Sequence, residues 1–138
     1  MRISRQLLVI ASLIILTPAG FGAKFYRGLA AEWVNNSFAG VFYEIFWCLV
    51  IFLFLPRAKT AAIALWVFIF TCILEFTQLW HPPFLEAVRG TFIGRTLIGT
   101  TFQASDFFYY VIGCALGWFW LQWICRKSSP AEKILHYK

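Results

Sequence analysis

Residues 38–80 read FAGVFYEIFWCLVIFLFLPRAKTAAIALWVFIFTCILEFTQLW. Two apolar runs, 38–55 and 61–80, flank a short polar turn that begins at Pro56. Crossing the roughly 30 Å hydrocarbon core of a bilayer takes about 17 to 25 helical residues, and each run has that length. A lipid-exposed backbone must satisfy its own hydrogen bonds, so each run is predicted to be a helix. The turn predicts that the two helices form a tight antiparallel hairpin.

Two more apolar runs of spanning length lie at residues 7–23 and 107–125. The first run follows the basic residues Arg2 and Arg5 and ends at Gly22-Ala23, so it also resembles a secretory signal peptide, and the sequence leaves both interpretations open. Together the four runs predict an all-α membrane protein, a compact bundle of four transmembrane helices in a single domain over residues 1–138. A long, partly re-entrant outer loop between the third and fourth helices completes this prediction.

The composition points to the same class. Hydrophobic residues make up 61% of the chain and charged residues 13%, and the mean hydropathy is +0.73, whereas soluble proteins carry about 25% charged residues. The predicted main partner is therefore the lipid bilayer. The net charge of +6 is interpreted as a topology signal and an attraction to anionic headgroups, and no nucleic-acid partner is predicted because no DNA or RNA module is visible.

Lysine and arginine are distributed unequally between the two sides of this predicted bundle. Cytoplasmic loops of membrane proteins carry an excess of these residues. We therefore predict that both termini are cytoplasmic, with the larger group inside and the smaller group outside. The larger group is Arg2, Arg5, Arg57, Lys59, Arg126, Lys127, Lys133 and Lys138, and the smaller group is Lys24, Arg27, Arg89 and Arg95.

Three carboxylates fall within or next to the predicted spans: Glu44, Glu75 and Asp106. An ionisable group at mid-bilayer costs about 2.5 to 3.5 kcal/mol on insertion scales, and such groups usually face the bundle interior. We expect all three to point inward and to have polar partners. Gln78 follows Glu75 by three residues and therefore shares its helical face.

The segment 81–106 is too polar for a span and too apolar for a solvated loop. Pro83 predicts the start of a short helix that ends at about Arg89, with the remainder extended or re-entrant. Arg89 and Arg95 then lie near the outer ends of the third and fourth helices. The carboxylates of those two helices are expected to be their counter-charges.

The fourth predicted helix carries a polar face and a packing motif. Asp106 and Tyr110 share one face of it. Gly113 and Gly117 form a GxxxG pattern, which permits the close approach of a neighbouring helix. We therefore assign the two glycines to helix packing.

No metal site, cofactor site or disulfide framework is predicted. The four cysteines lie in apolar runs without a CxxC pair, which favours free buried thiols. His81 and His136 lack the spacing of metal ligands, and His81 fits a cap at the outer end of the third helix better than a haem or chlorophyll ligand. The aromatic residues, 20% of the chain, still leave room for contacts with lipid or pigment.

The order of residues from Glu75 onward resembles a known family. It runs EFTQLWHPPFL from Glu75, then Arg89-Gly-Thr and Gly94-Arg-Thr-Leu-Ile-Gly99, and then Phe102, Asp106, Tyr110 and Gly113. This pattern is similar to the small bacterial membrane family called domain of unknown function 2809, over nearly the whole chain. More distantly, the second half resembles VanZ-like proteins associated with teicoplanin resistance, although Tyr110 stands where those proteins are expected to carry Asn. The resemblance implies a fold and a polar cluster, and no established activity.

Two classes of function remain open at this point. The first is an outward-facing site for a small molecule or a lipid headgroup. The second is an accessory or structural subunit of a larger membrane complex, in which other membrane-protein subunits cover the apolar faces. An enzyme is disfavoured and no catalytic residue is assigned, because no Ser/His/Asp order, metal spacing or phosphate loop is visible. The candidate binding residues are Glu44, Glu75, Gln78, Arg89, Arg95, Asp106 and Tyr110.

Overall fold

The computed structural model describes residues 4–99 and 102–128, and every secondary-structure element in these residues is a helix. Four helical segments are long and apolar enough to cross a membrane, so the predicted all-α membrane protein with four spans is confirmed. The second of them, Ala31–Phe54, is continuous but contains one wide turn. The segments are α1 (Arg5–Lys24), the run of α2 (Ala31–Trp33), the π-helix η1 (Val34–Phe38) and α3 (Ala39–Phe54), then α4 (Thr60–Thr77), and finally α7 (Asp106–Ser128).

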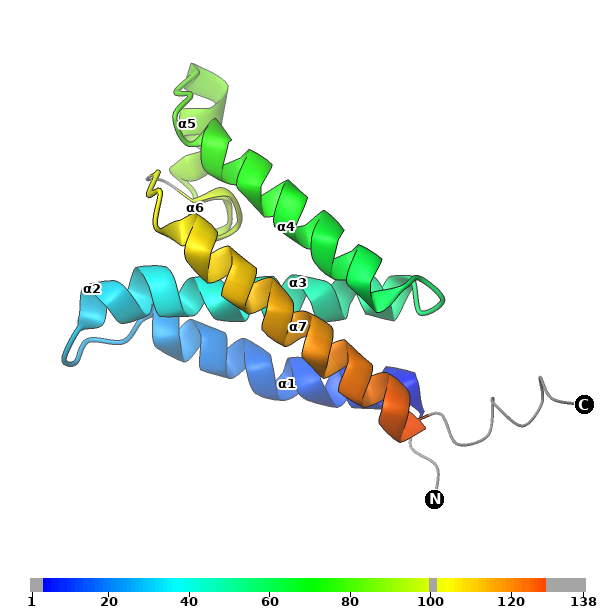
Figure 1. The fold of residues 1–138 in the computed structure, drawn as a ribbon. Helices are drawn as coiled ribbons and strands as arrows, with labels where there is room; N and C mark the ends of the chain where they lie inside the picture. The colour runs from blue at the N-terminus through cyan, green and yellow to red at the C-terminus, as the bar shows by residue number, and fades with distance from the viewer. Residues whose placement is uncertain (1–3, 100–101, 129–138) are drawn as a thin grey trace, which may run out of the picture.

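The bundle is closed at one end and spread at the other. The start of α1, the turn at residues 55–59 and the end of α7 lie at the same end of the molecule (Figure 1). From that turn α4 diverges from α3, while α1 and α7 stay against α3 (Figure 1). The predicted hairpin is therefore tight only at its turn, because other parts of the chain occupy the space between the two helices at the spread end.

The closest helix contact is the seam between α3 and α7, and it is built on the predicted glycines. A Cβ atom added at Gly113 would lie 2.6 Å from Glu44 Cβ, and one added at Gly117 would lie 2.9 Å from Cys48 Sγ. Only a glycine tolerates such an approach. Leu49 of α3 and Leu121 of α7 are fully buried nearby in the same core.

Two short helices occupy the spread end. Helix α5 (Pro83–Arg89) has the bounds that Pro83 predicts, because proline suits the first helical position. The expectation of an extended chain after it is wrong for residues 92–98, which form α6 (Phe92–Ile98). The Thr91 side chain starts α6 by accepting a hydrogen bond of 3.0 Å from the Gly94 backbone N–H.

Helix α6 ends between α3 and α4, so the outer loop is re-entrant in part, as predicted. Tyr43 Oη of α3 donates to the Leu97 carbonyl at 2.8 Å, and Gln78 Nε2 donates to the Ile98 carbonyl at 2.8 Å. Gly99 follows with a φ of +80°, and a Cβ there would collide with the Gln78 amide. The last two carbonyls of α6 therefore accept hydrogen bonds from one side chain of α3 and one at the end of α4, and these contacts hold α6 between the two helices.

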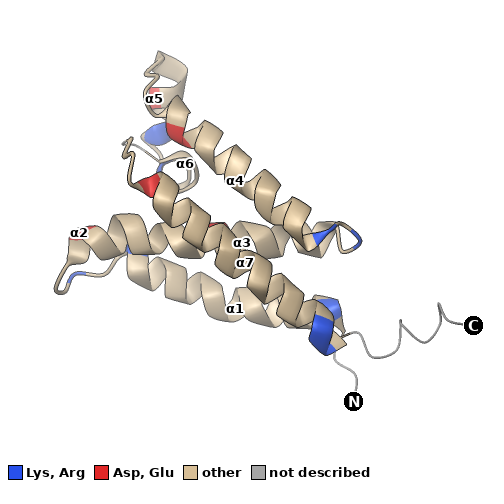
Figure 2. Cartoon of the chain, in the orientation of Figure 1, with Lys and Arg blue, Asp and Glu red and all other residues tan. Residues whose placement is uncertain are grey.

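Charged residues gather at the two ends of the bundle (Figure 2). The closed end carries basic residues at the start of α1, in the turn 55–59 and at the end of α7, whereas the spread end carries both signs (Figure 2). This distribution is the one that four crossings require, and the cytoplasmic position of the closed end stays a prediction. Four residues used above lie outside the described part of the chain: Arg2, Lys133, His136 and Lys138.

Candidate functional site

A cavity of about 420 Å³ lies at the spread end, enclosed by α1, η1, α3, α4, α6 and the start of α7. Pockets that bind small molecules typically measure about 300 to 1,000 Å³. The cavity exists because α4 diverges from α3 and because α6 closes the gap only in part (Figure 1). Its walls come from segments far apart in the sequence.

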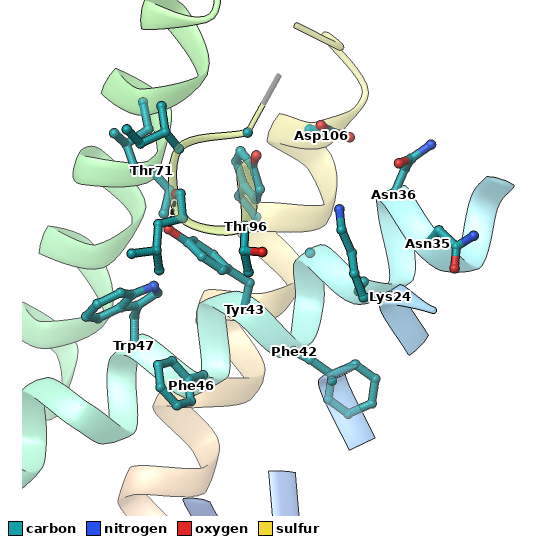
Figure 3. Close-up of a pocket in the computed structure, with 18 of the residues that line it drawn as sticks. Lys24, Asn35, Asn36, Phe42, Tyr43, Phe46, Trp47, Thr71, Thr96 and Asp106 are labelled. Carbon is teal, nitrogen blue, oxygen red and sulfur yellow. Dashed lines mark hydrogen bonds between the residues drawn. The ribbon is translucent and has the colours of Figure 1, made fainter. Parts of the chain in front are cut away.

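The lining of the cavity has a charged side and an aromatic side (Figure 3). Lys24 and Asp106 lie at the outer ends of α1 and α7, whereas Phe46 and Trp47 lie further along α3 (Figure 3). The helix from Asn35 to Trp47 rises about 18 Å at 1.5 Å per residue. That rise is roughly half of a 30 Å hydrocarbon core. The cavity therefore runs from the end of the spans to about mid-bilayer depth.

Four buried polar atoms of residues that line the cavity have no hydrogen-bond partner among the described residues. They are Asn35 Oδ1, Trp47 Nε1, Gln78 Oε1 and Asp106 Oδ1. Gln78 is only 7% exposed, and its amide orientation is fixed because Nε2 donates to the Ile98 carbonyl. An unsatisfied buried donor or acceptor costs about 1 to 3 kcal/mol. The residues around this one cavity thus carry four such atoms, which makes the cavity a candidate binding site.

Two of these unpaired groups were predicted and two were not. Gln78 and Asp106 belong to the predicted polar cluster. Asn35 lies in η1, and a π-helical turn is frequent at functional sites because it turns side chains away from the α-helical register. Trp47 is one aromatic residue in an apolar run, so the sequence holds no signal for it.

Three charged side chains line the cavity without forming an ion pair or a side-chain hydrogen bond among the described residues. They are Lys24, Arg95 and Asp106. The Lys24 side chain points toward the end of α7 that carries Asp106 (Figure 3). Lys24 entered the sequence analysis only as a topology signal. Its position beside the cavity depends on the packing of α1 against α3, which one sequence does not reveal.

Glu75 is fully buried behind the cavity wall and both of its oxygens are satisfied. Oε1 accepts a hydrogen bond of 2.8 Å from the Gln103 backbone N–H, and Oε2 accepts one of 2.7 Å from Tyr110 Oη. The expected pairing of Glu75 with an arginine is wrong, because the segment before α7 and α7 itself supply these donors instead. Glu75 thus ties α4 to α7, and both donor residues, Gln103 and Tyr110, line the cavity.

Glu44 is fully buried deeper in the bundle, in the seam between α3 and α7. Its Oε2 accepts a hydrogen bond of 2.9 Å from Cys114 Sγ and lies 3.3 Å from Thr71 Oγ1. Thr71 also lines the cavity, so one side chain separates Glu44 from it. The inward orientation expected of Glu44 and Glu75 is therefore observed, while Asp106 is half-buried at the cavity mouth.

Arg89 binds at the C-terminal end of α4 and does not line the cavity. Its guanidinium donates to the Thr77 carbonyl at 2.7 Å, to the Trp80 carbonyl at 2.9 Å and to Glu86 Oε1 at 2.8 Å. The expected counter-charge on α4 or α7 is wrong for Arg89, because α5 places the guanidinium beside the free carbonyls at the end of α4. Arg89 is 4% exposed and caps that helix in the place expected for His81.

His81 belongs to the same contact. Its Nδ1 lies 2.8 Å from Glu86 Oε1. The hydrogen bonds from His81 and then from Arg89 hold the pKa of the Glu86 carboxyl below its ordinary value of 4.5. The group formed by His81, Glu86 and Arg89 therefore fastens α5 to the end of α4.

The family described as "Protein of unknown function (DUF2809)" matches residues 29–114, which is more than half of the chain. The chain belongs to this family. The matched range holds every cavity-lining residue of this DUF2809 member except those of α1. No solved structure matches the chain. The likeness to VanZ-like proteins and the bacterial origin stay predictions.

The predicted cluster is thus divided by the fold of this DUF2809 member. Gln78, Arg95, Asp106 and Tyr110 line one cavity. Glu44 and Glu75 lie behind its wall, and Arg89 lies outside it. Additional residues from α1, η1 and α3 complete the lining, among them Lys24, Asn35, Asn36, Tyr43 and Trp47.

Proposed function

We propose that the protein binds a small amphipathic molecule in the cavity, with the polar head of the ligand beside Lys24, Arg95 and Asp106. The apolar part of the ligand lies against Phe46 and Trp47. The observation that supports this proposal is that residues lining one cavity carry four buried polar atoms without a partner among the described residues. A ligand that supplies the missing hydrogen bonds removes the cost of leaving these atoms unsatisfied.

The direction of the lining supports a lipid-like ligand. The charged groups lie where the spans end, and the aromatic groups lie toward mid-bilayer depth. A molecule that keeps its head at the membrane surface and its apolar part in one leaflet has the same polarity. The cavity volume of about 420 Å³ holds a head and the adjoining apolar segment.

A structural role alone does not account for the cavity groups. The seam between α3 and α7 shows that this bundle closes a helix contact with glycines and apolar side chains. Glu75 and Arg89 have structural roles because their polar atoms bind other parts of the chain. Asp106 and Gln78, which line the cavity, each keep a buried oxygen without a partner among the described residues, and a contact that only held helices together would use it.

The test is to purify the protein in mild detergent and identify every retained molecule by mass spectrometry. We expect an amphipathic small molecule in near-equal ratio to the protein. Asp106→Asn keeps the shape of the side chain, so it should lower the retained amount while the melting temperature stays within a few degrees. Glu32→Gln is the matched control, because Glu32 is an exposed acid at the same end that does not line the cavity.

Two results would contradict the proposal. One is a protein that retains no small molecule and instead co-purifies with other membrane proteins at fixed ratio, which is the outcome for an accessory subunit. The other is an Asp106→Asn variant that unfolds while its ligand content per folded protein is unchanged. In that case the carboxylate serves the fold, as Glu75 does.

A further inference from the structure

We infer that the ligand head joins a primary ammonium group to a phosphate ester, with the ammonium beside Asp106 and the phosphate between Lys24 and Arg95. This inference rests on the proposed function and adds the chemical class of the ligand. Two kinds of molecule carry this head: an acylated aminophospholipid of the membrane and its free, water-soluble headgroup. The experiment below separates these two sources.

The first argument is the kind of hydrogen bond that the cavity lacks. Three of the four unpartnered atoms, Asn35 Oδ1, Gln78 Oε1 and Asp106 Oδ1, are buried acceptors without a donor among the described residues, and the fourth, Trp47 Nε1, is a donor on the aromatic side. The Gln78 side chain is more than nine-tenths buried, its Nε2 is already used by the Ile98 carbonyl, and its oxygen has no donor among the described residues. A ligand for this cavity must therefore bring several donors. A primary ammonium group has three.

The second argument is the arrangement of charge. Asp106 is an acid on α7, while Lys24 and Arg95 are cations on α1 and α6, and none of the three is paired with another described residue. A head with one cation and one anion can meet both signs at once. A purely anionic head would leave Asp106 facing like charge, and a purely cationic head would leave two cations without a partner.

The third argument concerns the anion. Arginine presents a planar set of N–H donors that matches phosphate oxygens, and lysine adds a point charge. Arg95 also borders a second, smaller hollow beside Glu86, Arg89 and Gly90, and therefore lines both spaces. Lys24 lines the same cavity from the end of α1 (Figure 3). The phosphate position follows from these two cations.

The need for N–H donors excludes a similar head that carries a quaternary ammonium group. A quaternary ammonium group carries the same charge as a primary one but has no N–H donor. It would leave the oxygens of Asn35, Gln78 and Asp106 unsatisfied in the bound state. Comparison of the two heads on identical acyl chains therefore isolates the hydrogen bonds from the charge.

The experiment is native mass spectrometry of the full chain in detergent, titrated with lipids of identical acyl chains. We expect phosphatidylethanolamine to bind about tenfold more tightly than phosphatidylcholine, and more tightly than phosphatidylglycerol. Equal binding of the ethanolamine and choline lipids would overturn the inference while leaving the proposed function intact. Tighter binding of phosphatidylglycerol would do the same and would assign an anionic, hydroxyl-bearing head. Binding of none of the three would overturn the proposed function as well.

Glycerophosphoethanolamine, the same head without acyl chains, distinguishes the two sources of the ligand. If it competes with phosphatidylethanolamine at similar concentration, the head alone is the ligand. If it does not compete while the lipid binds, the acylated molecule is the ligand, as the aromatic side of the cavity indicates. Either result retains the chemical class.

Substitutions then assign the two halves of the head. Asp106→Asn should reduce the preference for ethanolamine over choline to about twofold or less, without weakening phosphatidylglycerol. Lys24→Gln should weaken all three lipids. The control Arg27→Gln removes an exposed cation that does not line the cavity and should weaken none. An Asp106→Asn variant that keeps the full preference, measured at unchanged melting temperature, would overturn the assignment of the ammonium group.

Discussion

The seam between α3 and α7 and the cavity between α3 and α4 show two ways in which one helix meets its neighbours. In the seam, Gly113 and Gly117 bring the two backbones together over apolar side chains. At the cavity, α4 leaves α3, and polar side chains from α1, η1, α4, α6 and α7 face the space between them. The close packing and the cavity lining therefore lie on different faces of the same stretch of α3, with Glu44 and Cys48 in the seam and Tyr43 and Trp47 on the cavity.

The difference teaches how to interpret a polar residue in this bundle. Glu75 and Arg89 are as deeply buried as the core; both oxygens of Glu75 and both terminal nitrogens of Arg89 bind other groups of the chain, and only Arg89 Nε has no partner among the described residues. Gln78 and Asp106 keep an oxygen free beside the cavity. Burial alone therefore does not mark a binding residue in a membrane protein. The presence of an unpaired atom on a cavity wall is the more informative sign.

The largest expected effect tests whether the two ends of the bundle lie on opposite sides of the membrane. In a background without native cysteines, we expect Leu29→Cys to react with an impermeant thiol reagent in intact cells and Lys59→Cys to react only after the membrane is opened. Leu29 is 92% exposed at the spread end, and Lys59 is exposed in the turn of the closed end. The reverse pattern would invert the predicted orientation.

A second effect should be large at the contact between α4 and α7. Glu75→Ala removes the acceptors of the Gln103 N–H and of Tyr110 Oη, so the free energy of unfolding should fall by about 3 kcal/mol. Glu75→Gln is the control, because an amide can accept from Gln103 and donate to the tyrosine oxygen. Unfolding in a mixed-micelle denaturant series measures both. Equal losses for the two variants would show that Glu75 acts through its charge.

A single methyl group added in the seam between α3 and α7 should lower the stability of the protein. Gly113→Ala places a Cβ where only 2.6 Å separates it from Glu44 Cβ, so we expect a loss of about 2 kcal/mol in the free energy of unfolding. The matched control is Gly22→Ala, because a Cβ at Gly22 meets nothing within 4 Å. That change should be neutral or slightly stabilising. If both variants behaved alike, the seam would not be a close contact.

The smallest expected effect concerns the contact of His81, Glu86 and Arg89 at the outer surface. The pKa of Glu86 is lowered in the fold, so the carboxylate stabilises α5 above the ordinary value of 4.5, and this contribution is lost as the pH falls through the lowered pKa. Amide hydrogen exchange in α5 should therefore become faster, relative to exposed control amides, in acid below that value. Glu86→Gln should remove this pH dependence, and a persistent dependence in that variant would assign it to another group.

The spans and the seam could be predicted from the sequence because they depend on local pattern. Apolar length identifies a helix that crosses lipid, and a glycine spacing identifies a close contact without naming the partner. The bounds of α5 followed from Pro83, since proline at the first position of a helix has a local cause. The burial of Glu44 and Glu75 followed from the cost of exposing charge to lipid.

The hydrogen-bond partners of the charged side chains and the cavity could not be predicted, because they depend on how far α4 diverges from α3. Arg89 bonds with Glu86 and with backbone carbonyls of α4, and these carbonyls carry no sequence signal. Helix α6 was hidden because Gly94 and Gly99 resemble loop residues. Gly94 is needed there because a Cβ would collide with the Val88 carbonyl, a contact between α5 and α6. Lys24 joins the site through packing alone.

The wide turn η1 makes the site sensitive to a change that a hydropathy profile does not register. A π-helical turn holds one residue more than an α-helical turn in the same span. Deleting a single codon within Val34–Phe38 would restore the α-helical register and rotate the preceding residues by about 100° relative to α3. Asn35 would leave the cavity wall, while the length, hydropathy and topology of the span stayed almost the same. Natural chains that lack this codon are expected to share the fold and to differ in what they bind.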